Sequence, residues 1–527
     1  MLAGNFKFAD LLQAIITLGI ELPAAWQHQF AKIDGFTVDS RQVNATTAFI
    51  ALQGVSAHGS IYIPSAIENG GKLILEDIQQ GSTCQAKLIP VSDDTSERGC
   101  VVIQIANLAS KLVEFFKTLY PQIAKLKQVL AITGTNGKTS VASLYAQMLS
   151  HTGRSAATIG TLGCMQYHCD GTTTNVAKTY NTTPDNVSLF GYLAWFADQD
   201  VYYVALEASS HGIEQGRTFG LPIDVAVFTN LTQDHLDYHG SMSAYGAAKR
   251  KLLNNPRIRS IVINADDPES ERWRNAVNSG QQILSFSVDD RNQTQAQGAD
   301  ALYADCIEYL DSGIQFRLNT LSEKHHMTLS LIGQFNVANY LAALGALTMA
   351  GIELATLIKY ADKLVGVKGR MELIKTHSAS IIVDFAHTPD ALKQALVAAR
   401  KHTANQLWIV FGCGGDRDKA KRPEMGKIAA SHADKIVLTQ DNSRFEHTDK
   451  IIDEICQGIS NEGNVDSKSV IRIVERQSAI KFALSNAENN DLILVAGKGH
   501  EDYLDIQGQK IHYDERAYVK TLAGEFL

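Results

Sequence analysis

Residues 128–151 read QVLAITGTNGKTSVASLYAQMLSH, and this stretch decides the fold of the middle of the chain. The apolar run Val129–Thr133 is typical of a buried strand, the helical pattern of Ser140–Ser150 follows it, and Gly153 is placed to end that helix. Between strand and helix lies GTNGKT, residues 134–139, which we call the phosphate loop. Such a loop lets backbone N–H groups and a helix N-terminus face a phosphate group.

The side chains of the phosphate loop favour a nucleotide. Lys138 can pair with the β and γ phosphates, and Thr139 can ligate Mg²⁺. The standard loop of this kind has its first glycine five residues before the second, and Ile132 occupies that position here, so the general pattern is not matched. The alternative is an ordinary tight turn, but Gly-Lys-Thr with a strand before it and a helix after it favours phosphate binding.

Short apolar runs alternate with helical patterns through most of the chain, which is typical of α/β units with parallel strands. The N-terminal region differs, because it carries many turn residues and short β segments and ends in an expected helix at Asn107–Tyr120. The alternation of apolar runs and helical patterns is interrupted around Lys363–Gly369 and begins again after it. We therefore predict an α/β protein of three domains, with boundaries at 1–110, 111–366 and 367–527.

Composition excludes several classes of protein. The 527 residues are 45% hydrophobic and 20% charged, as in globular proteins, and the net charge of −8 argues against a dedicated nucleic-acid binder. The seven scattered cysteines do not form a disulfide pattern, and Cys164 and Cys169, the one pair spaced like a metal clip, lack a second pair. The first twenty residues have no basic segment, and no apolar run is long enough to span a bilayer. We expect a cytoplasmic protein that binds neither nucleic acid nor membrane.

Polar motifs follow several expected strands of the middle region. Glu207 ends a strand at the edge where ligands of parallel sheets bind, and its carboxylate suits Mg²⁺. His235 and His239 are spaced i, i+4, so they could bind zinc on a helix, or lie in a loop that brings His235 to the phosphate site. Taken alone, the segment favours a third interpretation, an ordinary surface histidine. Lys249 lies in a helical pattern, and spacing alone does not single it out.

Four polar loops follow apolar strands in the last third of the chain, at residues 384–390, 412–418, 441–444 and 497–501. Because the carboxyl ends of parallel strands meet at one edge of a sheet, these loops together predict a binding face. Arg417 and Arg444 can each clamp a carboxylate with two hydrogen bonds.

Taken in order, these motifs resemble the Mur ligase family over essentially the whole chain. The stretches that carry the resemblance are TGTNGKTS (133–140), EASSHGIEQGR (207–217), NLTQDHLDYHG (230–240), the Lys249 segment, GQFNVANYLAAL (333–344), GRMELI (369–374), DFAHTPDAL (384–392), GCGGDRDKAKRP (412–423) and AGKGHEDY (496–503). Within the family, they are most similar to the members that add the third residue of the peptidoglycan stem peptide.

The resemblance implies a UDP-binding N-terminal domain, a central ATPase-like domain and a C-terminal Rossmann-like domain with the amino-acid site. It implies that ATP phosphorylates the γ-carboxylate of UDP-N-acetylmuramoyl-L-alanyl-D-glutamate, and that the amine of meso-2,6-diaminopimelate attacks the acyl phosphate. Mg²⁺ would assist, and the family suggests a monomer.

The resemblance also gives roles to individual residues. Lys138, Thr139, Glu207 and His235 would serve phosphates and two Mg²⁺ sites, and Lys249 matches a lysine that is carbamylated to N6-carboxylysine. The nucleotide would contact Gly134, Thr135, Asn136, Gly137, Ser140, Asn339, Arg370, Asp384 and His387, with Asn336 as a further candidate. The UDP-muramoyl-dipeptide would contact Ser40, His58, Gly59, Ser60, Thr182, Thr183, Ser209, Gln215 and Arg217. The incoming amino acid would contact Arg417, Asp441, Asn442, Arg444, Gly497 and Glu501.

One departure concerns the amino-acid site, where the diaminopimelate pattern Asp-Asn-Pro-Arg reads Asp441-Asn442-Ser443-Arg444. Proline would fix φ in this turn, so serine is expected to loosen it, while the charge-reading Arg444 is kept. Three alternatives stay open. They are an L-lysine-adding ligase of the same family, a folylpolyglutamate synthase with the same ATPase core, and a nucleotide-dependent switch without ligase activity. The N-terminal domain and the TTPD (182–185) and SSHGIEQGR (209–217) segments argue against the second.

Overall fold

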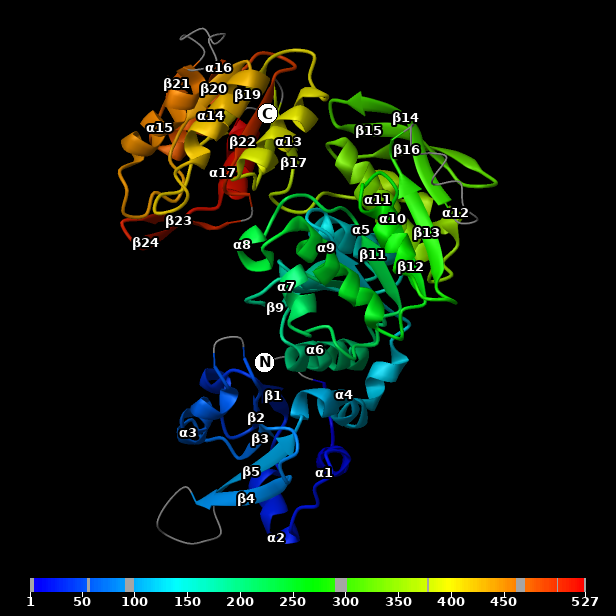
Figure 1. Ribbon diagram of the computed structural model, residues 1–527. Helices are drawn as coiled ribbons and strands as arrows, with labels where there is room; N and C mark the ends of the chain where they lie inside the picture. The colour runs from blue at the N-terminus through cyan, green and yellow to red at the C-terminus, as the bar shows by residue number, and fades with distance from the viewer. Residues whose placement is uncertain are drawn as a thin grey trace. The chain divides into compact units, whose positions relative to one another are not determined.

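The computed structural model describes residues 4–54, 57–90, 99–289, 301–376, 379–460, 470–499 and 501–525. The chain divides into two compact units. Figure 1 shows its helices and strands, coloured from blue at the N-terminus to red at the C-terminus. Unit 1 holds residues 1–285 and 342–354, and unit 2 holds residues 286–341 and 355–527. The boundaries fall within β13 (Gln282–Ser287), α11 (Gln334–Thr348) and α12 (Leu354–Ile358).

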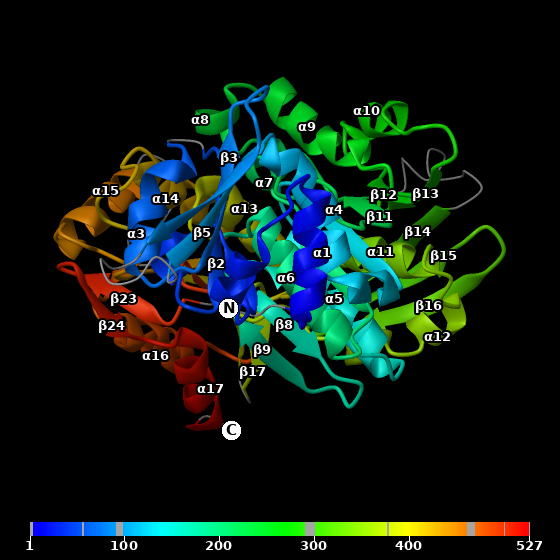
Figure 2. The same cartoon turned by 90° about the horizontal axis from the view of Figure 1, so that it is seen from below.

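Unit 1 begins with a five-stranded sheet in the order β1-β2-β3-β5-β4, in which only β4 is antiparallel to its neighbour. Its strands are β1 (Gly35–Thr37), β2 (Thr47–Ala51), β3 (Leu73–Ile78), β4 (Gln85–Pro90) and β5 (Gly99–Ala106). The accompanying helices and 3₁₀ turns are α1 (Phe8–Thr17), α2 (Ala24–Gln27), η1 (His28–Phe30), η2 (Ser40–Gln42), η3 (Gly59–Tyr62), α3 (Ile63–Glu68), α4 (Leu108–Leu119) and η4 (Pro121–Lys125). Helix α1 packs along α4, as Figure 2 shows. The helix expected at Asn107–Tyr120 is confirmed to within one residue at each end.

The second sheet of unit 1 carries the phosphate loop. Its strands run in the order β12-β11-β6-β10-β7-β8-β9, and the first five are parallel. They are β6 (Gln128–Thr133), β7 (Ala156–Gly160), β8 (Gly163–Tyr167), β9 (Thr173–Ala177), β10 (Tyr203–Glu207), β11 (Val225–Phe228) and β12 (Ser260–Asn264). The helices are α5 (Lys138–His151), α6 (Asn186–Asp198), α7 (Ser210–Glu214), α8 (Leu236–His239), α9 (Met242–Arg250), η5 (Lys251–Asn254) and α10 (Ser270–Asn275).

The strand and the helix that flank the phosphate loop form as the sequence predicts. Every residue of β6 is buried, as expected for a central parallel strand with both faces covered. Helix α5 ends where Gly153 takes a left-handed φ of +76°. There Gly153 N–H donates to Ser150 O over 2.9 Å, and Arg154 N–H donates to Leu149 O over 3.0 Å. These two bonds satisfy carbonyls that the end of a helix leaves free.

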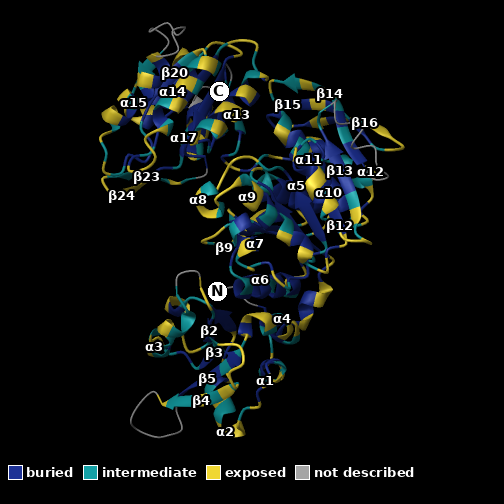
Figure 3. Ribbon diagram, viewed as in Figure 1, coloured by how far each residue is buried: buried dark blue, intermediate teal, exposed yellow. Residues whose placement is uncertain are grey.

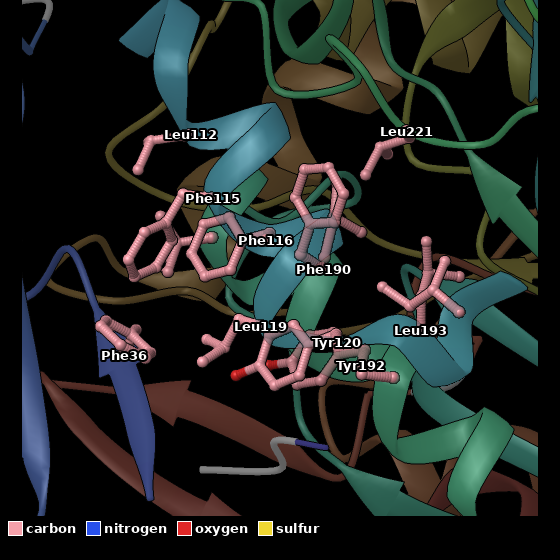
Figure 4. Close-up of a cluster of buried hydrophobic side chains, with 14 of the residues drawn as sticks. Phe36, Leu112, Phe115, Phe116, Leu119, Tyr120, Phe190, Tyr192, Leu193 and Leu221 are labelled. Carbon is pink, nitrogen blue, oxygen red and sulfur yellow. The ribbon is translucent and has the colours of Figure 1, made fainter. Parts of the chain in front are cut away.

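Aromatic side chains join the two sheets of unit 1 into one core (Figure 4). Phe36 of β1 packs edge-on against Phe115 of α4, with ring centroids 5.4 Å apart. Phe116, the next residue of α4, stacks on Phe190 of α6 at 5.2 Å. Truncating such a buried ring to alanine typically costs about 3–5 kcal/mol. Helix α4 therefore fixes the N-terminal sheet against the phosphate-loop sheet.

Unit 2 contains an antiparallel meander of β14 (Ala301–Leu310), β15 (Gly313–Asn319) and β16 (Lys324–Leu329). It also contains a six-stranded sheet in the order β17-β18-β22-β19-β20-β21, parallel except for β17. The strands are β17 (Glu372–Lys375), β18 (Ser380–Asp384), β19 (Leu407–Phe411), β20 (Lys435–Leu438), β21 (Val470–Arg472) and β22 (Leu492–Ala496), with the hairpin β23 (Tyr503–Ile506) and β24 (Gln509–His512). The helices are η7 (Ala361–Lys363), α13 (Pro389–Arg400), α14 (Lys421–His432), α15 (Thr448–Ser460), α16 (Arg476–Asn486) and α17 (Glu515–Glu525).

The six-stranded sheet has helices on both faces. Ile382 and Leu494 pack with residues of α13, α14 and α15, whereas Ile381 and Val495 pack with residues of α16 and α17. Figure 3 shows these strands as buried and the outer faces of α14 and α15 as partly exposed. A parallel sheet covered on both faces in this way is a Rossmann-like arrangement, as expected. Among the described helices, none has the length and apolar character that a bilayer-spanning helix needs.

Candidate functional site

The phosphate loop is held from the neighbouring strand. Gly134 passes so close to Thr229 that a Cβ at Gly134 would overlap the Thr229 hydroxyl oxygen. Just after β11, the Asn230 side chain accepts from Asn136 N–H over 2.8 Å and donates to Asn136 O over 3.1 Å. The Thr135 N–H donates to Asn230 O over 2.9 Å. The loop is therefore preorganised at the N-terminus of α5, with Ser140 in the first turn of that helix.

Lys138 lies folded over this loop. Its Nζ donates to Gly134 O over 2.8 Å and to Thr135 O over 2.9 Å. Its charge acts on two other groups of the site, because it opposes the rise in the pKa of Glu207 and contributes to the fall in the pKa of Lys249. Lys138 is thus a positive charge that an approaching phosphate group can draw out of the loop.

Glu207 ends β10 beside the phosphate loop, as its place at the carboxyl edge of the sheet predicts. Its side chain is 2% exposed, and Oε2 accepts from the hydroxyls of Thr139 over 2.9 Å and Thr161 over 3.1 Å. Oε1 accepts from Thr161 N–H over 3.0 Å. Burial raises the pKa of Glu207, while Lys138 and the hydrogen bonds from Thr139 and Thr161 oppose that rise. A buried carboxylate beside a threonine hydroxyl offers the oxygen ligands that Mg²⁺ prefers, so these residues fit the ion.

Lys249 is brought into this site from α9, 115 residues beyond Gly134 in the chain. Its side chain is buried, and its Nζ donates to Gly134 O over 2.8 Å and lies 4.5 Å from the centre of the Tyr245 ring. Burial lowers the pKa of Lys249 well below its ordinary value, and the nearby Lys138 lowers it further. A lowered pKa favours the amine form of Lys249 over the ammonium, and an amine can react with an electrophile.

His235 belongs to a cluster of rings next to Lys249. The His211 ring lies 4.8 Å from His235 and 5.4 Å from His239, and His239 Nε2 lies 3.0 Å from the Ser210 hydroxyl. Burial is the main cause that lowers the pKa of His211 and of His239. Within the described part of the chain, no group of three or more His, Cys, Asp and Glu side chains is arranged to hold a metal. The zinc interpretation of His235 and His239 therefore has no third ligand among the described residues.

The residues expected to contact the muramoyl-dipeptide form one hydrogen-bonded network that begins at Glu207. The Thr183 hydroxyl donates to Glu207 O over 2.8 Å and accepts from Ser209 N–H over 2.9 Å. Arg217 donates to Thr183 O over 2.7 Å and to the Gln215 side chain over 2.6 Å. The remaining member, Thr182, has its hydroxyl 3.3 Å from that of Thr161. The network thus links four of the expected residues to the backbone carbonyl of Glu207, and it links Thr182, through the Thr161 hydroxyl, to the Glu207 carboxylate.

Two further expected segments lie in the N-terminal sheet of unit 1. Ser40 follows β1 and its carbonyl accepts from the Asn69 side chain over 3.0 Å. The segment His58–Ser60 follows β2, with His58 Nδ1 accepting from Ser60 N–H over 3.1 Å. Gly59 passes the backbone of β2 closely, and its N–H donates to Leu52 O over 2.7 Å. Because β1 and β2 are parallel neighbours, both segments leave the same edge of the sheet.

The candidate nucleotide residues of unit 2 fall into two groups. Asn336 and Asn339 are buried on α11, where the Asn339 amide donates to Asn336 Oδ1 over 3.1 Å. Asp384 at the end of β18 accepts from the N–H groups of Met371 and Ala386, and burial raises its pKa. The other two, Arg370 and His387, both contact the Phe385 ring, Arg370 at 4.6 Å and His387 ring to ring at 4.6 Å.

The loops after β20 and β22 meet in unit 2. We call Asp441, Asn442, Arg444, Lys498 and Glu501 the 441–501 cluster. The Asn442 amide donates to Glu501 Oε2 over 3.1 Å, and a Cβ at Gly497 would lie 2.6 Å from Asp441 Oδ2. Lys498, whose role the sequence did not reveal, is fully buried among them. Arg417, in contrast, is exposed, and among the described residues it has no hydrogen bond or ion pair.

Arg444 is held in a left-handed backbone conformation with φ of +47°. Its N–H donates to Asp505 O over 2.9 Å, and its carbonyl accepts from Gln507 N–H over 2.7 Å, so the β23–β24 hairpin fixes it. Nη1 donates to Gly415 O over 2.7 Å. The preceding Ser443 is 3% exposed, and its carbonyl accepts from Glu446 N–H over 3.0 Å, which ties down the turn that lacks proline.

Two buried arginines that the sequence did not single out support these loops. Arg422 donates to Gly414 O over 3.1 Å and pairs with Glu446, whose Oε1 accepts from Asp416 N–H over 2.6 Å. Arg476 pairs with Glu515 and donates to Gln440 O over 3.1 Å and Ala496 O over 2.8 Å, the carbonyls just before two loops of the site. Arg422 lies within the quoted motif GCGGDRDKAKRP, whereas Arg476 is the first residue of α16 and belongs to no quoted motif.

Three family descriptions match successive parts of the chain. Residues 32–117 match the catalytic domain of the Mur ligase family, residues 132–347 match the Mur ligase middle domain, and residues 369–499 match the Mur ligase glutamate ligase domain.

Curated relatives are similar over nearly the full length. The UDP-N-acetylmuramoyl-L-alanyl-D-glutamate–2,6-diaminopimelate ligase of Vibrio vulnificus (strain YJ016) is 37% identical over 93% of this chain and 94% of its own. The ligase of that name from Haemophilus ducreyi (strain 35000HP / ATCC 700724) is 38% identical over 93% of this chain and 96% of its own. A solved structure of a ligase with the same name aligns with a TM-score of 0.68 at 32% identity, covering 97% of this chain and 98% of that one. The chain therefore belongs to the Mur ligase family.

Proposed function

We propose that this chain catalyses the ATP-dependent ligation of meso-2,6-diaminopimelate to the D-glutamate γ-carboxylate of UDP-N-acetylmuramoyl-L-alanyl-D-glutamate, a step of peptidoglycan precursor synthesis. Relatives of that name, 37% and 38% identical over 93% of the chain, support the activity. The observation that carries the proposal is the network around Glu207. It ties the phosphate loop, through Thr139, to the expected dipeptide residues, through Thr183. A nucleotide phosphate and an acceptor carboxylate would therefore be bound from one set of side chains.

In the first step, an oxygen of the γ-carboxylate attacks the γ-phosphorus of ATP, the bond to the β–γ bridging oxygen breaks, and ADP leaves. Negative charges crowd together, so the site must supply positive charge and N–H donors. The Lys138 ammonium and the N–H groups of the phosphate loop would face the phosphates. Thr139 and Glu207 would hold Mg²⁺, which spreads charge over the β and γ phosphates when bound, and His235 would serve a second ion.

In the second step, the amine of the amino acid attacks the acyl phosphate. The tetrahedral intermediate expels inorganic phosphate, and the amine loses a proton to leave an amide. Lys249 would act as a carbamate, because the uncharged amine favoured by its buried position adds CO₂ and releases a proton. The carbamate is an anion that would attract Mg²⁺, whereas a protonated Lys249 would repel it.

Arg444 supports diaminopimelate over lysine as the incoming amino acid. Diaminopimelate carries a second carboxylate at the far end of its side chain, and a guanidinium can grip it with two hydrogen bonds. The 441–501 cluster supplies both that guanidinium and carboxylates for the neighbouring ammonium. An L-lysine-adding ligase would have no use for the guanidinium.

The direct test measures phosphate release with ATP and the UDP-dipeptide, with diaminopimelate, with lysine and with no amino acid. We expect release and a UDP-tripeptide product, identified by mass, only with diaminopimelate. Lys138→Ala is the matched inactive control and should unfold near the wild-type temperature. Release that is independent of any amino acid would support a nucleotide switch instead, and equal use of lysine would support a lysine-adding ligase.

The cytoplasm is the compartment that these substrates require, because ATP and the UDP-linked precursor are made there. All seven cysteines are free, which suits a reducing compartment. We further infer that the working enzyme is a monomer, as the resemblance to the family suggests. Light scattering at assay concentration should give the mass of a single 57.5 kDa chain, and a dimer mass would contradict this inference.

A further inference from the structure

Lys498 is a fully buried ammonium at the centre of the 441–501 cluster. Its Nζ donates to Glu501 Oε2 over 2.7 Å and to Asn442 Oδ1 over 2.9 Å, and it lies 3.7 Å from Asp441 Oδ1. Its side chain is 0% exposed, and Tyr503 covers it with a ring whose centre lies 5.1 Å away. A lysine so buried and so paired cannot itself reach a ligand without giving up these partners.

The contacts of Lys498 fix how the Asn442 side chain is turned. Asn442 Oδ1 accepts from Lys498 Nζ and from Asp505 N–H, each over 2.9 Å. With its oxygen held by two donors, the amide must present its NH₂ group on the other side, where it donates to Glu501 Oε2 over 3.1 Å. If the Asn442 amide were flipped, its NH₂ group would face two other donors, Lys498 Nζ and Asp505 N–H, and could accept from neither.

The same contacts make the two oxygens of Glu501 different. Oε2 accepts from both Lys498 and Asn442, whereas Oε1 has no hydrogen bond to any residue that the structure describes. The Glu501 side chain is 23% exposed, so it is accessible to a ligand. The carboxylate is thereby held in one orientation and offers one free oxygen as an acceptor.

We propose that Lys498 is a positioning residue of the amino-acid site. It does not contact the substrate, but it orients Asn442 and Glu501 so that Glu501 Oε1 receives the substrate ammonium beside Arg444. It also neutralises part of the charge of Asp441 and Glu501, so that a free ammonium is not held by two bare carboxylates. This role rests on the proposed ligase function and adds a determinant of selectivity to it, because a bare carboxylate pair would also attract the side-chain ammonium of lysine.

The test compares Lys498→Met with Lys510→Met. Both lysines lie over the Tyr503 ring, at 5.1 and 4.4 Å, but Lys510 is exposed on β24 and has no hydrogen bond or ion pair to the cluster among the described residues. Lys498→Met should raise the KM for diaminopimelate by about 10- to 100-fold, since small misplacements of binding groups are costly. The KM for ATP should stay within about twofold, and the preference for diaminopimelate over lysine should fall by about tenfold. Lys510→Met should match the wild type in all three.

A double-mutant cycle with Glu501→Gln separates positioning from general support of the fold. Because Lys498 acts through Glu501, Lys498→Met/Glu501→Gln should have about the same diaminopimelate KM as Glu501→Gln alone, and this comparison decides the matter if Lys498→Met fails to fold. The role of Lys498 would be overturned if the increases in diaminopimelate KM of the two single variants multiplied in the double variant. An unchanged diaminopimelate KM in folded Lys498→Met would also overturn it. A wild type that releases no phosphate with diaminopimelate would instead refute the proposed function.

Discussion

The Thr139 hydroxyl donates a hydrogen bond to Glu207 Oε2 over 2.9 Å, across 68 residues of sequence. The bond follows from the sheet, in which Glu207 of β10 lies opposite Ile132 of β6, just before the phosphate loop. A carboxylate that would be costly to bury alone is stabilised by hydroxyl and N–H donors and by the nearby Lys138. The Glu207 carboxylate therefore places a negative charge beside the phosphate loop, where the proposed Mg²⁺ would bind.

Replacing Glu207 by glutamine tests the contribution of the negative charge separately from that of the side chain's packing. The change keeps the size of the side chain but replaces one accepting oxygen by an NH₂ donor, and we expect kcat/KM to fall by about 10²–10³-fold with loss of saturation by Mg²⁺. Because burial raises the pKa of Glu207, the ionised side chain destabilises the ligand-free fold at neutral pH relative to a neutral one. Glu207→Gln should thus melt at or above the wild-type temperature, as calorimetry would show. Near-normal activity at low Mg²⁺ would remove Glu207 from the metal site.

Gly160 is expected to be intolerant of even one methyl group. It ends β7, and an added Cβ would overlap the carboxyl group of Glu207. In Gly160→Ala the carboxylate must move away from Thr139 and Thr161, so we expect kcat/KM to fall by about 10²-fold. The control is Gly524→Ala, since a Cβ at Gly524 of α17 meets no atom within 4 Å. Equal activity of both variants in the phosphate-release assay would contradict the close packing.

Lys249 should carry a carbamate in the active enzyme. Its buried position and the neighbouring Lys138 hold its pKa well below the ordinary value, which favours the amine form that adds CO₂. Isotope-labelled bicarbonate should give a carbamate signal by NMR, and Lys249→Ala should lack that signal and be inactive, with partial rescue by short carboxylic acids. Lys251→Ala is the control, because Lys251 is half exposed and pairs with Glu214. An indispensable but unmodified Lys249, or a fully active Lys249→Ala, would contradict the proposal.

Glu446 should make the stability of the protein sensitive to acid. Hydrogen bonds from the buried Arg422, followed by one from Asp416 N–H, lower its pKa from 4.5 to about 2. A depressed carboxyl pKa adds stability that is present above pH 4.5 and is lost as pH falls toward 2.

Denaturant unfolding of Glu446→Gln between pH 7 and pH 2 checks this expectation. The variant should be less stable than the wild type at pH 7, and the difference should shrink as pH falls from about 4.5 to about 2. Glu424→Gln on α14 is the control, because Glu424 is exposed and has no ion pair in the described ranges of the chain. A constant difference at every pH would show that Glu446 stabilises by packing alone.

Local pattern predicted the parts of the site that lie within one strand, one loop and one helix. The phosphate loop between β6 and α5, and Glu207 at the carboxyl edge of β10, follow from the alternation of apolar runs and glycine-rich turns. The identification of Lys249 as a site residue required the family resemblance. Its contact with Gly134 depends on how α9 packs against a segment that is far away in sequence. Spacing along a helix cannot report such a contact.

The supporting residues were missed for a related reason. Thr161, which holds both oxygens of Glu207, stands one residue after a strand with no motif around it. Lys498 stands inside a quoted motif, but a lysine between two glycines reads as a solvated turn residue until its burial is known. In both cases the role comes from tertiary burial and from partners distant in sequence, which one sequence does not encode locally.

Arg444 should decide which amino acid is added. Its backbone is fixed by the β23–β24 hairpin, and its side chain is 24% exposed, so the guanidinium is both held and accessible. A site built to pair a distal carboxylate rejects an analogue that lacks it, by up to about 10⁴-fold, because the guanidinium is then left without its partner. The wild type should therefore have a far higher kcat/KM for diaminopimelate than for lysine.

The matched variants are Arg444→Ala, Arg444→Lys and Arg417→Ala, each assayed with both amino acids. Arg444→Ala should lose most of the preference for diaminopimelate, and Arg444→Lys should keep only part of it, because an ammonium lacks the planar fork of a guanidinium. Arg417 is also an expected carboxylate reader, but it is exposed, so Arg417→Ala separates a general loss of positive charge from the loss of the fixed guanidinium. Equal use of lysine by the wild type, or an undiminished preference in Arg444→Ala, would overturn the assignment of Arg444.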